Sequence, residues 1–411
     1  MQRLFPIILL AFISNSALAN TEILHWWTSP GEQAALHVLE QQLNDHNISY
    51  TPSAVIGGGG DTAMMVLQAR ALAGNAPDIV QLEGPNIKAW DDIGLLYSLN
   101  SIAKDEHWDE KFYPLSVNIN KTSHGYVALP LSLHRLNWLW VNQRLLKRLQ
   151  LSVPTNWTDM LEVMEKAKNA GVQPLALGAR QWQVNQLFES IVIGTGGVDF
   201  YLSTLVDLDV KKINSAQMRY ALNVFRRISK ITGQTLPNMD WDTATKQLID
   251  DKALFQIGGD WILGDLLAQQ IAVPNHIGCY SAPSAVNSYL YNMDSLIFVK
   301  SKHFEHSTAI NIAKALADKA FQTQFNRSKG SIPSRRDIAI DDFNDCQKKS
   351  YDDFHYAINN GLAIPSMTDS MAINPVAQQA INSEIYRFFR NSAVSDNDVI
   401  TRIISIAESN E

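Results

Sequence analysis

Aromatic and polar side chains occur together where the predicted strands of this chain end. Trp26 and Trp27 follow a short apolar run, with Glu32 a few residues beyond. Asp260 directly precedes Trp261. A flat aromatic ring can stack on the C–H faces of a sugar, and carboxylates accept hydrogen bonds from sugar hydroxyl groups. These residue types in this pattern predict carbohydrate recognition.

Several tryptophans of the chain do not belong to this group. Trp138, Trp140 and Trp157 lie in apolar or helical runs, where packing in the core is the expected role. Trp27 and Trp261 could also be core residues. Because each lies close to a carboxylate at a strand end, we favour ligand binding for these two.

The sequence gives little support for catalysis or for a bound metal or nucleotide. No His-Glu-x-x-His pattern and no Gly-x-Ser-x-Gly elbow occur. Gly57–Gly60 lacks the Gly-Lys-Ser/Thr of a phosphate loop, so we interpret it as a loop at a cleft edge. A glycoside hydrolase remains an alternative, because it needs two carboxylates at a set distance and the sequence does not reveal that distance. We expect no cofactor, no metal and no enzymatic activity.

The amino-terminal residues predict export to the periplasm. Arg3 precedes an apolar run, and Ala17-Leu18-Ala19 matches the pattern that a signal peptidase cuts, so residues 1–19 are predicted to be a signal peptide. No later segment has the roughly 18 to 20 continuous apolar residues of a membrane span, so direct membrane insertion is not expected. The net charge of −7 disfavours nucleic acid as a partner.

The chain contains two cysteines, Cys279 and Cys346. In a compartment where thiols oxidise, an even count favours one disulfide. The sequence does not establish that their Cα atoms lie within bridging distance, so two separate buried thiols are the alternative.

The elements that position these residues alternate between strands and helices. The segments predicted to be strands are 22–27, 50–56, 78–82, 253–257 and 292–299. Helices over 32–44 and 62–73 separate the first three, and this order predicts parallel pairing. Residues 126–140 form an extended segment that we expect to cross between two lobes.

A series of short motifs resembles a known family. They are Ile23-Leu-His-Trp-Trp27, Asp78-Ile-Val-Gln-Leu82, Leu129-Pro-Leu-Ser-Leu-His-Arg135, Gly259-Asp-Trp261, Asn292-Met-Asp-Ser295, Ser328-Lys-Gly-Ser-Ile332 and Pro365-Ser-Met-Thr-Asp369. In their order and spacing they are similar to the extracellular solute-binding proteins of ABC sugar importers, in particular the glucose- and mannose-binding branch. The resemblance spans essentially the whole mature chain.

The resemblance implies a set of ligand contacts. It implies stacking rings at Trp27 and Trp261, further walls at Trp26 and Trp182, and polar contacts from Glu32, Asp294 and Lys329. His134 lies in the segment that matches the family's interlobe strand, where it would reach either the ligand or only the hinge.

Two positions depart from the glucose-binding branch. Glu83 and Asp369 occupy positions that are often histidine in relatives, and we include both in the expected site. Histidine can donate a hydrogen bond, whereas an ionised carboxylate only accepts, so a hydroxyl bound there must turn its hydrogen toward the protein. The more acidic pocket disfavours acidic sugars and suits a neutral or amino sugar.

The implied fold is α/β: a two-lobed periplasmic binding protein with the ligand between the lobes and two or three crossing segments. We expect the N-terminal lobe over residues 20–129 and about 292–345, and the C-terminal lobe over 130–291 and about 346–411. A disulfide, if formed, would lie near the hinge. Closure around a neutral hexose would complete the site and present a surface to the membrane permease subunits of an ABC importer.

Two other functions stay open at this point. An exported carbohydrate-active enzyme would share the aromatic and carboxylate walls but would consume its sugar. A sugar receptor for a chemosensory or kinase partner would use the same fold and closure and differ in its docking surface. We expect the transport receptor to be a monomer.

Overall fold

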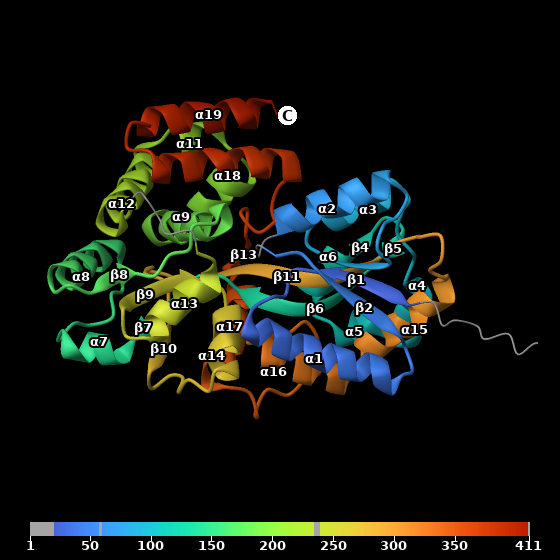
Figure 1. Ribbon diagram of the computed structural model, residues 1–411. Helices are drawn as coiled ribbons and strands as arrows, with labels where there is room; N and C mark the ends of the chain where they lie inside the picture. The colour runs from blue at the N-terminus through green and yellow to red at the C-terminus, as the bar shows by residue number, and fades with distance from the viewer. Residues whose placement is uncertain (1–19, 57–59, 234–238, 410–411) are drawn as a thin grey trace, which may run out of the picture.

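The computed structural model describes residues 20–56, 60–233 and 239–409. The predicted signal peptide, residues 1–19, and residues 57–59 of the predicted glycine loop lie outside these described residues. The chain forms two lobes, each built on its own β-sheet and covered by helices (Figure 1). This architecture confirms the predicted two-lobed α/β fold.

The first lobe is built on a seven-stranded sheet. Its strands are β1 (Thr21–His25), β2 (Tyr50–Ala54), β3 (Ile79–Leu82), β6 (Ala128–Arg135), β11 (Tyr289–Phe298), β12 (Ile332–Pro333) and β13 (Ala363–Pro365). The order is β12-β6-β11-β3-β1-β2, with β13 paired to β11. β1 is parallel to β2 and β3, as predicted, and β11 is antiparallel to β3 and β6.

Both faces of this sheet are buried. The neighbouring residues Ile23 and Leu24 belong to two different apolar clusters, because successive side chains of a strand point to opposite faces. The surrounding elements are α1 (Pro30–Asp45), α2 (Gly60–Leu72), α3 (Pro85–Asp92), α4 (Asn100–Asp105), α5 (Trp108–Lys111), α6 (Pro114–Asn120), β4 (Lys121–Thr122), β5 (Gly125–Tyr126), α15 (His306–Leu316), α16 (Lys319–Lys329) and α17 (Asp345–Asn360).

The second lobe is built on a four-stranded sheet with the order β10-β7-β9-β8. Its strands are β7 (Trp138–Asn142), β8 (Gln173–Leu175), β9 (Ala253–Gly258) and β10 (Ile277–Ser281). Its helices are α7 (Gln143–Arg148), α8 (Trp157–Asn169), α9 (Gln181–Gly196), α10 (Val198–Tyr201), the π-helical turn η1 (Leu202–Val206), α11 (Val210–Ile213), α12 (Ala216–Thr232), α13 (Trp241–Ile249), α14 (Trp261–Ala268), α18 (Pro375–Arg390) and α19 (Asp396–Glu408). Trp138, Trp140 and Trp157 are buried in its core, as expected.

The chain crosses between the lobes from β6 to β7, from β10 to β11 and from β13 to α18. The predicted extended segment therefore does connect the two sheets. The lobes also touch through α14, which packs against α1 and α16. This contact brings backbones together, since a side chain at Gly31 would place its Cβ 2.3 Å from the carbonyl carbon of Gly264.

Cys279 and Cys346 form a disulfide, which confirms the favoured interpretation of these residues. Cys279 lies in β10 of the second lobe. Cys346 lies in α17, which packs against β11, β12 and β13. The bond therefore connects a strand of the second lobe to a helix that covers the first sheet.

Candidate ligand-binding site

A small pocket lies where the two lobes meet. Its cavity volume is about 40 Å³, so the pocket is narrow in this structure. The residues that line it are Trp26, Glu32, Glu83, His134, Trp182, Trp241, Trp261, Asn292, Asp294, Lys329 and Asp369. The pocket thus brings together all of the expected site residues except Trp27, and it adds Trp241 and Asn292.

Three tryptophans at the starts of second-lobe helices form one wall of the pocket. The ring centroid of Trp261 lies 5.8 Å from that of Trp182 and 6.4 Å from that of Trp241, with interplanar angles of 71° and 64°. The rings therefore meet edge to face and form a corner. The buried Nε1 atoms of Trp182 and Trp261 have no hydrogen-bond partner among the described residues, so both indoles could donate to a ligand.

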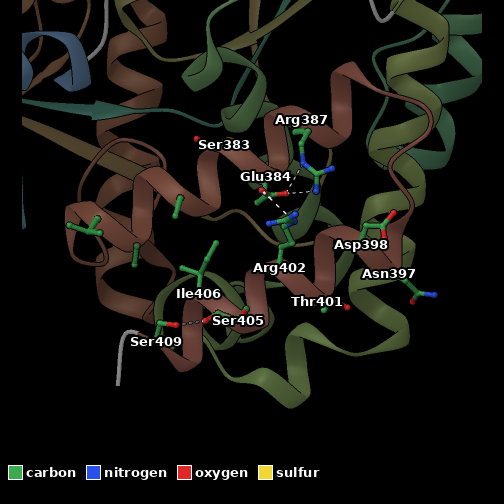
Figure 2. Close-up of a pocket in the computed structure, with 13 residues that line it drawn as sticks. Ser383, Glu384, Arg387, Asn397, Asp398, Thr401, Arg402, Ser405, Ile406 and Ser409 are labelled. Carbon is green, nitrogen blue, oxygen red and sulfur yellow. Dashed lines mark hydrogen bonds and ion pairs between the residues drawn. The ribbon is translucent and has the colours of Figure 1, made fainter.

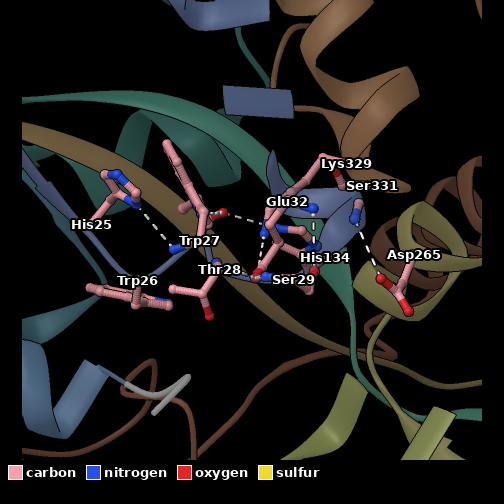
Figure 3. A network of polar contacts seen from close by, with 12 residues as sticks. His25, Trp26, Trp27, Thr28, Ser29, Glu32, His134, Asp265, Lys329 and Ser331 are labelled. Atoms are coloured by element: carbon pink, nitrogen blue, oxygen red, sulfur yellow. Dashed lines mark hydrogen bonds and ion pairs between the residues drawn. The ribbon is translucent and has the colours of Figure 1, made fainter. Parts of the chain in front are cut away.

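Trp27 is absent from the lining of the pocket. Its side chain is 0% exposed and packs edge-on against Phe325. Because adjacent side chains at the end of an extended segment point to opposite sides, only one ring of the Trp26–Trp27 pair reaches the pocket. The two rings point in different directions from β1, and Trp26 is the one in the lining (Figure 3). This placement differs from the expected stacking role of Trp27.

Glu32 and Lys329 form a buried ion pair at the pocket. Lys329 Nζ donates to Glu32 Oε1 over 2.8 Å, and their side chains are 3% and 8% exposed. Glu32 Oε2 accepts from the backbone nitrogens of Thr28 and Ser29 and so caps the first turn of α1 (Figure 3). One carboxylate therefore fixes both the start of α1 and the position of the lysine.

His134 connects carboxylates from two different parts of the fold. Its Nδ1 lies 2.5 Å from Asp260 Oδ1, and its Nε2 lies 3.2 Å from Asp294 Oδ2. Burial alone would lower the pKa of His134, but the charges of Asp260 and Asp294 and their hydrogen bonds outweigh it and raise the pKa to about 9. At neutral pH the ring is therefore protonated and donates to both carboxylates.

Asp294 is a buried carboxylate held by several donors. Besides His134, it accepts from Trp27 Nε1 at 3.3 Å and from Gln81 Nε2 at 2.8 Å. Burial opposes ionisation, but His134, Lys329 and the hydrogen bond from Gln81 lower the pKa of Asp294 to about 2. The group is thus an ionised acceptor whose direction is fixed from three sides.

Glu83 and Asp369 add two further acceptors to the lining. Asn292 Nδ2 donates to Glu83 Oε1 over 3.1 Å, and Gln186 Nε2 donates to Asp369 Oδ2 over 2.8 Å. Asn292 Oδ1 is buried and has no hydrogen-bond partner among the described residues. The lining is therefore rich in hydrogen-bond acceptors, which suits a ligand that carries several hydroxyl groups.

The chain is similar in sequence to a known family of proteins. The family of bacterial extracellular solute-binding proteins matches residues 24–323. The chain belongs to this family. Two relatives named "probable sugar-binding periplasmic protein", from Rhizobium meliloti and Brucella suis, are each 33% identical to it. These alignments cover 98% and 95% of this chain and 96% and 92% of the relatives.

Solved structures show the same fold. Maltose-bound T. maritima MalE3 matches this solute-binding protein with a TM-score of 0.78 at 15% identity, over 95% of this chain and 99% of that chain. The named relatives are solute-binding proteins, which are carriers and not enzymes.

A second hollow of this solute-binding protein lies between α18 and α19 (Figure 2). Its described lining contains no aromatic ring, and Glu384 pairs there with Arg387 and Arg402.

The described part of the chain contains no cluster of His, Cys, Asp and Glu that could hold a metal. It also contains no helix of the length and apolar character that crossing a membrane requires. The interlobe pocket is thus the candidate site.

The two added lining residues carried signals in the sequence. Trp241 follows Asp240 at a helix start, which repeats the Asp260–Trp261 pair. Asn292 lies two residues before Asp294 on β11, so the two side chains share one face of the strand.

Proposed function

We propose that this solute-binding protein is an exported receptor that captures a neutral hexose, glucose- or mannose-like, and delivers it to an ABC permease. The observation that carries the proposal is the pocket itself. A corner of indole rings from the second lobe faces hydrogen-bonded carboxylates of the first lobe. Rings for the C–H faces and acceptors for the hydroxyls are the two requirements of sugar binding.

The charge of the pocket favours a neutral sugar. Side chains of both lobes line the pocket. Four lining carboxylates, Glu32, Glu83, Asp294 and Asp369, stand against two basic groups, His134 and Lys329. Both basic groups already pair with carboxylates, so a negatively charged sugar would meet repulsion. A hydroxyl-rich neutral ring would meet acceptors.

Capture follows from lobe closure about the crossing segments. An open form exposes the tryptophan wall of the second lobe, and closure brings Asp294 and the Glu32–Lys329 pair of the first lobe against the bound ring. A micromolar dissociation constant requires about −8 kcal/mol. Stacked rings and several charge-assisted hydrogen bonds supply energies of this order after the cost of closure.

Delivery to a membrane permease and location in the periplasm rest on the family and on the signal sequence. Relatives at 33% identity are named periplasmic, and Ala17-Leu18-Ala19 ends a predicted signal peptide. In this proposal the closed monomer docks on the permease subunits of an importer.

A thermal-shift screen of the mature protein tests the proposal. The panel contains neutral hexoses, amino sugars, uronic acids and short oligosaccharides, and the best ligand is recovered and identified afterwards. We expect saturable stabilisation by a neutral hexose that is recovered unchanged. Conversion of the sugar would indicate an enzyme, and stabilisation by none of them would contradict sugar binding.

A further inference from the structure

One face of α9 connects the pocket to the third crossing between the lobes. Trp182, Gln186 and Glu189 lie four and three residues apart, so they share this face. Trp182 lines the pocket. Gln186 and Glu189 contact residues 366–369, the segment that leaves β13 and carries Asp369 into the pocket.

Glu189 clamps the backbone of this crossing. Its side chain is completely buried, and burial raises the pKa of its carboxyl group. Its carboxylate accepts from Ser366 Oγ at 2.9 Å and from the backbone nitrogens of Met367 and Thr368 at 2.8 and 3.2 Å. Tyr201 also donates to it, over 2.5 Å. Burial of a carboxyl group costs free energy, and these donors offset that cost. Their hydrogen bonds in turn fix the backbone of the crossing.

Gln186 holds the side chain of Asp369. Gln186 Nε2 donates to Asp369 Oδ2 over 2.8 Å. Ser366 Oγ lies 3.2 Å from the same oxygen but only 2.9 Å from Glu189 Oε2, and its single proton can serve one acceptor at a time. The amide of Gln186 therefore donates to the Asp369 carboxylate and helps to set its direction.

We propose that Gln186 and Glu189 are positioning residues that attach this crossing to the second lobe and aim Asp369 at the sugar. The first lobe meets the crossing at Gly84, where an added Cβ would lie 2.1 Å from the carbonyl oxygen of Ser370. Closure thus brings Glu83 of the first lobe to an Asp369 already oriented by α9. The effect on sugar affinity rests on the proposed function, whereas the clamp itself does not.

Amide hydrogen exchange in the sugar-free protein tests the clamp. Glu189→Met removes the acceptor, so the Met367 and Thr368 amides should exchange at least about tenfold faster. Glu189→Gln keeps a carbonyl acceptor and should restore most of the protection. If Glu189→Met does not fold, Ser366→Ala breaks the clamp from the other side and should speed exchange of the Met367 amide. Unchanged exchange in the folded variants would overturn the clamp.

A double-mutant cycle tests the aim of Asp369. Gln186→Met should weaken sugar binding about tenfold in the wild-type background and have no effect in an Asp369→Ala background, because Gln186 acts through Asp369. Gln181→Met is the matched control, since Gln181 lies on the same helix and bonds Ser383 instead. Equal losses in both backgrounds would overturn the positioning role. If the wild type binds no sugar, the proposed function fails, and the exchange rates still decide the clamp.

Discussion

Trp27 Nε1 donates a hydrogen bond to Asp294 Oδ2 over 3.3 Å. The bond joins the residue pair that follows β1 to Asp294 in the middle of β11, which lines the pocket. The Trp27 ring is 0% exposed and fills the core of the first lobe. Its hydrogen bond helps to hold the Asp294 carboxylate in place. Trp27 is thus absent from the pocket lining but bonded to Asp294, which lines it, and we predict that its role is support.

Replacement of Trp27 should mainly affect stability. Trp27→Ala leaves a large cavity and should lower the free energy of unfolding by about 3 to 5 kcal/mol, measured by urea denaturation. Trp27→Phe keeps most of the ring and should cost less. A Trp27→Ala protein that unfolds like the wild type but no longer binds sugar would instead place the ring at the ligand.

Replacement of Trp182 should mainly affect sugar binding. Trp182 is only partly buried at the pocket, so Trp182→Ala should weaken binding by about 1 to 3 kcal/mol in calorimetric titration while the unfolding free energy changes little. Tyr220→Ala serves as the control, because Tyr220 is 46% exposed on α12, away from the pocket. Equal affinity in the Trp182→Ala and Tyr220→Ala variants would remove Trp182 from the site.

Loss of the proton from His134 should make the protein less stable at alkaline pH. The pKa of His134 is raised to about 9 in the folded state, against roughly 6.5 in an unfolded chain. The folded state then binds more protons above pH 6.5, so this stabilisation is fully present below about pH 6.5 and disappears as pH rises through about 9. The loss is on the order of 3 kcal/mol. Denaturation from pH 6.5 to 9 should show this decline in the wild type and a much flatter profile in His134→Gln.

The Glu32–Lys329 pair should show strong coupling. Lys329→Met leaves the Glu32 carboxylate buried without its cation and should cost about 3 to 5 kcal/mol of stability. Glu32→Gln preserves the cap of α1, because glutamine also serves in a capping box. The double variant should therefore be more stable than Lys329→Met alone. Additive losses in urea denaturation would show that the two side chains do not act as a pair.

Local patterns predicted much of this structure. The alternating strands and helices of the first third predicted parallel pairing, whereas the polar residues of the site were implied mainly by the family resemblance. Which ring of the Trp26–Trp27 pair enters the pocket could not be predicted, since the orientation of residues after a strand depends on tertiary packing. The contacts of Gln186 and Glu189 join segments about 180 residues apart, and no local pattern reports them.

A crystal structure of the mature protein grown with its best-binding hexose tests the central claim most directly. The account predicts one unmodified sugar ring between the tryptophan wall and the first lobe, with hydroxyl groups within hydrogen-bond distance of Asp294 and Asp369. A sugar bound in the hollow between α18 and α19, or a pocket that stays empty at saturating sugar, would contradict it.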